Sequence, residues 1–89
     1  MSILVEVFSS PGCSKCGQAK KTLKSIVDEF GDADIQWREV NILEELDYAV
    51  GLGVLSTPAI AINGKLEYTG LPSAGKLRER LRKLLEEEA

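Results

Sequence analysis

The chain of 89 residues has no histidine, only two cysteines, and few aromatic side chains, which make up 6% of its residues. A structural zinc site needs four ligands, and two cysteines without histidine supply only half of them. No apolar run approaches the roughly 20 residues of a membrane span. Basic residues are outnumbered, and a net charge of −3 argues against phosphate binding. We therefore expect neither a membrane nor a nucleic acid as a partner.

What the sequence does have is an ordinary globular composition, with 44% hydrophobic and 28% charged residues. At this length we expect a single domain over residues 1–89 with a modest core, and a monomer. The opening segment Met1-Ser2-Ile3-Leu4-Val5-Glu6 lacks the basic region and cleavage site of a secretory signal. The sequence therefore favours a cytoplasmic location.

Apolar periodicity predicts an α/β chain in the order β-α-β-α-β-β-α. We expect the first three strands to be parallel and the last to pair antiparallel through the turn Asn63-Gly64. Glu6 is the one polar residue of the first strand, and we expect it to reach solvent at a strand edge; the alternative is a partly buried acid that moves protons to and from Cys16. In the short second helix we expect a buried stripe of Leu46, Ala49 and Val50. The predicted strands lie at about 3–8, 35–41, 59–62 and 65–69; the helices lie at about 13–30, from Asn41 or Glu44 to about 50, and after a Ser73 cap.

Both cysteines lie at the corner between the first strand and the first helix, in the segment Pro11-Gly12-Cys13-Ser14-Lys15-Cys16. The start of a helix is electropositive and stabilises an anion, and Lys15 adds a positive charge. We therefore expect the pKa of Cys13 to fall below that of a free thiol. Cys16 lies one turn deeper and should be less exposed. This predicts that Cys13 attacks a substrate disulfide and that Cys16 attacks the resulting mixed disulfide.

Other readings of the cysteine pair compete with this one. A structural disulfide would close a very small loop and would remove little entropy from the unfolded chain. A Cu(I) carrier could use two thiolates alone, although copper carriers usually have Met where this chain has Pro11, and they end on a strand. Two buried cysteines could also lie close by coincidence. The alternative to an enzyme is thus a metal-carrying or redox-inert binding module.

The chain resembles the thioredoxin superfamily, in particular the small thioredoxin/glutaredoxin-like proteins of archaea and bacteria. The resemblance covers nearly the whole chain. It depends on the segment from Phe8 to Cys16, on Thr57-Pro58 before an apolar strand, and on the closing hairpin and helix.

This resemblance implies a thioredoxin-like fold, with a four-stranded mixed sheet flanked by three helices. It also implies a protein-disulfide reductase with no cofactor beyond the redox-active Cys13–Cys16 pair. Pro58 would be cis and would hold the Thr57 backbone beside Cys13, where an extended substrate can pair with it. The residues expected to bind substrate or tune the cysteines are Gly12, Ser14, Lys15, Thr57, Pro58 and Gly70.

The motif Gly12-Cys13-Ser14-Lys15-Cys16 departs from the Trp-Cys-Gly-Pro-Cys of typical thioredoxins, which leaves the redox potential open. The turn after Thr69 has one glycine, Gly70, and no acid, unlike the glutathione-binding turn of glutaredoxins. The partners we expect are protein substrates with disulfides, and either a flavin-dependent reductase or glutathione as the electron donor.

Overall fold

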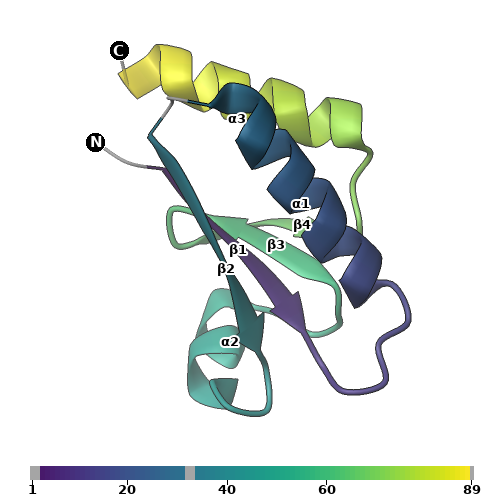
Figure 1. Cartoon of the computed structure of the whole chain (residues 1–89). Helices are drawn as coiled ribbons and strands as arrows, with labels where there is room; N and C mark the ends of the chain where they lie inside the picture. Colours follow the sequence, from purple (N-terminus) through teal and green to yellow (C-terminus); the bar gives the residue numbers. More distant parts are fainter. Residues whose placement is uncertain (1–2, 32–33, 89) are drawn as a thin grey trace.

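The computed structural model describes residues 3–31 and 34–88. Within them the chain forms seven elements in the predicted order (Figure 1). They are β1 (Ile3–Ser9), α1 (Cys16–Phe30), β2 (Ile35–Asn41), α2 (Leu46–Leu52), β3 (Ala59–Ile62), β4 (Lys65–Thr69) and α3 (Ala74–Glu88). No helix in the described ranges combines the length and the apolar character needed to cross a membrane.

The four strands form one mixed sheet in the order β2-β1-β3-β4. β1 pairs parallel with β2, antiparallel with β3, and β3 pairs antiparallel with β4. Asn63 and Gly64 both have positive φ, which matches the predicted hairpin turn. The mixed sheet with three helices confirms the predicted fold class.

The direction of β3 corrects the prediction that the first three strands are parallel. β2 ends at Asn41 beside Ser9, and β3 begins at Ala59 beside Phe8, so the chain leaves and re-enters the sheet at the same end. A parallel crossover needs a helix long enough to return the chain to the other end. The seven residues of α2 span only about 10 Å, against about 23 Å for a strand of seven residues.

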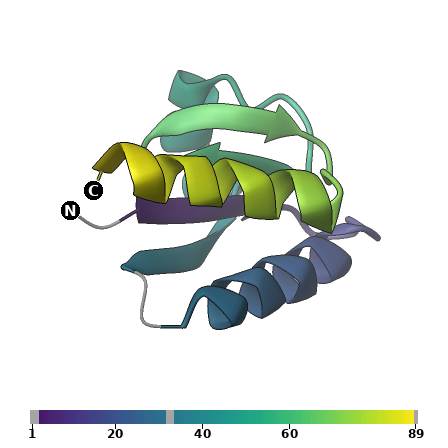
Figure 2. The ribbon, with the colours of Figure 1, turned by 90° about the horizontal axis from the view of Figure 1, so that it is seen from above.

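Helices cover both faces of the sheet, with α1 and α3 on one face and α2 on the other (Figures 1 and 2). The larger core lies under α1 and α3 and joins side chains such as Val5, Leu23, Ile60 and Leu81. A smaller core under α2 joins Phe8, Val40, Ala49 and Ala59. α3 begins as predicted, because the Ser73 hydroxyl accepts a hydrogen bond from the Lys76 backbone N–H at 3.2 Å.

The predicted buried stripe of α2 is wrong in two of its three positions. Ala49 is buried, but Leu46 is 54% exposed and Val50 is 60% exposed. The helix starts later than predicted, at Leu46, and continues through Gly51 to Leu52. Because α2 has only two turns and a single small buried residue, polar contacts must contribute to its position on the sheet.

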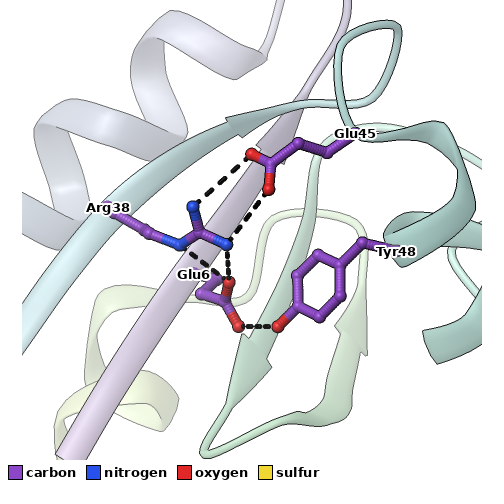
Figure 3. A network of polar contacts seen from close by, with 4 residues as sticks. All are labelled: Glu6, Arg38, Glu45 and Tyr48. Carbon is purple, nitrogen blue, oxygen red and sulfur yellow. Dashed lines mark hydrogen bonds and ion pairs between the residues drawn. The ribbon is translucent and has the colours of Figure 1, made fainter.

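Glu6 supplies these polar contacts, and its burial corrects the prediction that it reaches solvent. The residue is 0% exposed and lies under α2. The Arg38 guanidinium lies 2.7 Å from its Oε2, and the Tyr48 hydroxyl donates a hydrogen bond to its Oε1 (Figure 3). Arg38 also reaches Glu45, at 3.4 Å. We call these four side chains the Glu6 network; it ties β1, β2 and α2 together.

Candidate active site

The corner between β1 and α1 is a turn rather than the start of the helix. The Cys13 N–H donates a hydrogen bond to the Ser10 carbonyl at 3.2 Å, and Gly12 has a φ of 80°, a conformation that favours glycine. α1 therefore begins at Cys16 and not at Cys13 as predicted, with Lys15 as the residue before it. Cys13 lies outside the helix, in front of its first turn.

The two sulfurs of the site differ in their surroundings. Cys13 and Cys16 form a disulfide, with 5.5 Å between their Cα atoms. Cys16 is buried, 4% exposed, and its Sγ lies 4.0 Å from the Phe8 carbonyl oxygen. Cys13 is partly exposed. One sulfur is thus open to another molecule, and its neighbour lies behind it.

Cys13 opens on a pocket of about 300 Å³. The structure brings together there six of the eight residues predicted for the site, along with two from the loop before Cys13. Cys16 lies behind the pocket, and Gly70 is not among the residues that line it. The lining residues are Ser10, Pro11, Gly12, Cys13, Ser14, Lys15, Thr57 and Pro58.

Thr57 and Pro58 reach the pocket from the loop between α2 and β3. Their peptide bond is cis, and Pro58 is buried while Thr57 is partly exposed. Ala59, the next residue, pairs with Phe8 of β1, which places this loop beside the cysteine corner. Ala59 also pairs with Thr69 of β4. Gly70, the residue after Thr69, therefore lies just beyond this loop.

A hydrogen bond between two hydroxyl groups joins the two loops of the pocket. Ser10 Oγ and Thr57 Oγ1 are 2.7 Å apart and partly buried, although the residues are 47 positions apart in the chain. Sequence reasoning missed Ser10, because nothing in the sequence shows that its hydroxyl faces Thr57. The contact fixes the separation of the loop that holds Cys13 from the loop that holds Pro58.

Charged groups behind the corner are paired. The Glu39 carboxylate accepts a hydrogen bond from the Ser9 hydroxyl at 2.9 Å and lies 2.9 Å from the Lys20 ammonium. Lys20, and to a lesser degree Ser9, hold the pKa of Glu39 below its usual range. Lys15 is exposed at the pocket. The open side of Cys13 is therefore next to a cation and not to a carboxylate.

No three His, Cys, Asp or Glu side chains gather as a possible metal site within residues 3–31 and 34–88. Cys13 and Cys16 are bonded to each other. The arrangement of one open and one buried sulfur suits thiol-disulfide exchange.

Comparisons with known proteins agree with this chemistry. The family model described as thioredoxin domain matches residues 1–82. The chain is 32% identical over 83 residues to a thioredoxin of Methanocaldococcus jannaschii, and the match covers 93% of this chain and 96% of that protein. Thioredoxin 1 of Thermosipho africanus has a similar fold, with a TM-score of 0.78 at 19% identity over 96% of this chain and 97% of that one.

A longer protein contains a related segment. The chain is 26% identical over 84 residues to part of NADPH-dependent thioredoxin reductase 3 of Arabidopsis thaliana. The match covers 94% of this chain and 16% of that protein.

Proposed function

Because the chain belongs to the thioredoxin family and is a thiol-disulfide oxidoreductase, we propose that Cys13 is its nucleophile and Cys16 its resolving thiol. The supporting observation is the contrast between the two sulfurs. Cys13 opens on the pocket, while Cys16 is 4% exposed. A thiol must meet the substrate to attack it, whereas a resolving thiol needs only to reach the sulfur of its neighbour.

The reaction transfers two electrons from the dithiol to the substrate. The Cys13 thiolate attacks one sulfur of the substrate disulfide, so that the substrate S–S bond breaks and a mixed disulfide forms. The departing substrate thiolate takes up a proton. Cys16 then loses its proton and attacks the Cys13 sulfur, which releases the second substrate thiolate and forms the Cys13–Cys16 disulfide.

The Thr57–Pro58 loop is our candidate for the docking element. An extended substrate segment placed across the pocket would pair with the Thr57 backbone as an added strand. Pro58 has no N–H and therefore does not compete for that pairing. The Ser10 to Thr57 hydrogen bond, at 2.7 Å, supports this role because it holds the loop at a fixed place beside Cys13.

The remaining site residues would shape and charge the pocket. Gly12 allows the turn before Cys13, since its φ of 80° is unfavourable for other residues. Ser14 is exposed between the cysteines, where a larger side chain would crowd the substrate. Lys15 would stabilise the Cys13 thiolate through its positive charge. Gly70, one step beyond the pocket, would contact only a substrate that extends past the loop.

We propose a flavin-dependent reductase, rather than glutathione, as the electron donor. A segment similar to this chain is part of an NADPH-dependent thioredoxin reductase, which supports a partner of that kind. The turn after Thr69 has no acid to bind the glutathione backbone. The disulfide form of the protein must be reduced again in each catalytic cycle. We therefore propose the reducing cytoplasm as its location. We also propose that the chain acts as a monomer.

Single cysteine variants test the proposed roles. Cys13→Ser should abolish reduction of an insulin disulfide, because the attacking thiolate is gone. Cys16→Ser should still attack but should accumulate a mixed disulfide with the substrate, visible as a mass increase that dithiothreitol reverses. Ser25→Ala, on the exposed side of α1, is the control and should retain full activity.

Two results would count against the assignment. Undiminished turnover by Cys13→Ser would remove Cys13 as the nucleophile. A mixed disulfide trapped by Cys13→Ser instead of Cys16→Ser would reverse the two roles.

A further inference from the structure

Four lysines are concentrated in the segment next to the pocket. Residues 9–27 include Lys15, Lys20, Lys21 and Lys24 and no acidic residue. The rest of the chain has seven Lys and Arg against fourteen Asp and Glu. A protein that is acidic overall therefore has a cationic region around its reactive cysteine.

Three of these lysines are exposed and have no carboxylate partner among residues 3–31 and 34–88. Lys20 is the exception, since its ammonium lies 2.9 Å from Glu39. Lys15 lines the pocket with Cys13. Lys21 and Lys24 are three residues apart on the exposed side of α1, at about 7.5 and 12 Å along the helix axis from Cys16. We call Lys15, Lys21 and Lys24 the lysine surface.

Local stability does not explain this placement. Cations are favourable near the C-terminal end of a helix and acids near its N-terminal end. In α1 the first turn has no acid and the last turn has no base, so the charges of this helix do not follow its dipole. Elsewhere on the surface, basic side chains are paired with acids; for example, Arg78 lies 2.7 Å from Glu29.

We propose that the lysine surface binds acidic side chains that flank the target disulfide, so that the preferred substrates have Asp or Glu beside the reacting cysteine. This inference rests on the proposed function, because the substrate must place its disulfide at Cys13. The attraction acts where the substrate docks, and it steers acidic partners to the one sulfur that is open. The rest of the acidic molecule repels the same partners.

Three disulfide peptides of the same length test the preference. They carry Asp, Asn or Lys at the two positions on each side of each cysteine of the disulfide. We expect kcat/KM to follow the order Asp, Asn, Lys, with about a ten-fold difference between the Asp and Lys peptides at low ionic strength. Because exposed charges are screened by salt, the difference should shrink to about two-fold at roughly 0.5 M NaCl.

A charge-removing variant and its matched control locate the effect. In Lys21→Gln/Lys24→Gln only Lys15 of the lysine surface remains. The ratio of kcat/KM for the Asp peptide to that for the Lys peptide should then fall from about ten to about three. Lys65→Gln/Lys83→Gln removes two exposed cations from β4 and α3, outside the lysine surface. This control has the same net charge and should keep the wild-type ratio.

Each other outcome contradicts the inference in a recognisable way. Equal kcat/KM for the three peptides at low salt would overturn it, as would an equal loss of the ratio in both double variants. Failure to reduce any of the peptides would instead contradict the proposed function, and the inference with it.

Discussion

Two polar sites, one within strand β1 and one just after it, differ in whether their polar groups already have partners inside the protein. Glu6, in the middle of the strand, is 0% exposed, and both of its carboxylate oxygens have partners (Figure 3). Cys13, four residues beyond the strand, is partly exposed and faces a pocket of about 300 Å³. The Glu6 network is closed, and the cysteine corner is open.

The difference shows how an unusual residue can be assigned to structure or to chemistry. A buried carboxylate is costly unless it is paired, and here Arg38 and Tyr48 satisfy it from two other elements. Nothing remains open for a substrate to bind. At the cysteine corner the protein leaves one sulfur accessible and fixes its surroundings. We therefore assign the Glu6 network to the stability of α2 on the sheet and the corner to catalysis.

The largest expected effect comes from breaking the closed site. Glu6→Gln keeps the volume of the side chain but weakens both hydrogen bonds to the buried carboxylate, while Arg38, which is 44% exposed, keeps Glu45 as a partner. We expect the free energy of unfolding to fall by about 2 to 3 kcal/mol in urea titration, less than for a fully buried ion pair, because water screens the charge that is left on Arg38. Activity of the folded fraction should stay close to wild type. A loss of turnover without a loss of stability would contradict the division between the two sites.

A smaller effect should follow from removing one hydroxyl of the same network. Tyr48→Phe keeps the ring that packs against Phe8 and Arg38, but it loses the hydrogen bond to the Glu6 carboxylate. We expect a loss of about 2 kcal/mol, typical of a hydrogen bond to a charged group.

The hydrogen bond to Glu6, and then burial, raise the pKa of Tyr48 above its usual value. A group with a raised pKa stabilises the fold fully below its unfolded pKa of about 10, and this contribution is lost as the pH rises through the folded pKa. The wild-type protein should therefore lose this contribution to its stability above about pH 10. Tyr48→Phe has already lost it at neutral pH and should show no such further loss. Parallel alkaline losses in the two proteins would mean that Tyr48 does not titrate with unfolding.

The smallest effect is expected at the open site. Thr57→Val is nearly isosteric but removes the hydroxyl that contacts Ser10, and it should lower kcat/KM for an insulin disulfide by about five-fold, the equivalent of one ordinary hydrogen bond. Thr57→Ser retains the hydroxyl and should recover most of the loss. If Val and Ser behave alike, the backbone alone positions the loop and the hydrogen bond has no role in docking.

The cysteine corner could be predicted because its signals are local. The spacing of Cys13 and Cys16, the apolar strand before them and the helical periodicity after them lie within 30 consecutive residues. The Asn63-Gly64 turn and the Ser73 cap are also local, and both were predicted correctly. At this corner the predicted start of α1 was wrong, since the turn at Gly12 moves that start from Cys13 to Cys16.

The parts that sequence reasoning missed depend on long-range pairing. Glu6 is satisfied by Arg38, its direct neighbour in the β1–β2 register, and this register follows from the packing of the whole sheet. The Ser10 to Thr57 contact depends likewise on β3 running antiparallel beside β1. In α2, seven residues are too few for periodicity to define a buried face, and so the burial of Leu46 and Val50 was predicted wrongly.

Competitive alkylation of the two thiols tests the central contrast most directly. The reduced protein is treated with a limiting amount of iodoacetamide at neutral pH, and the modified cysteines are identified by mass spectrometry with and without denaturant. If Cys13 is the open thiol and Cys16 lies behind it, label should appear on Cys13 in the folded protein and on both cysteines after unfolding. Equal labelling in the folded state, or labelling of Cys16 first, would contradict the account.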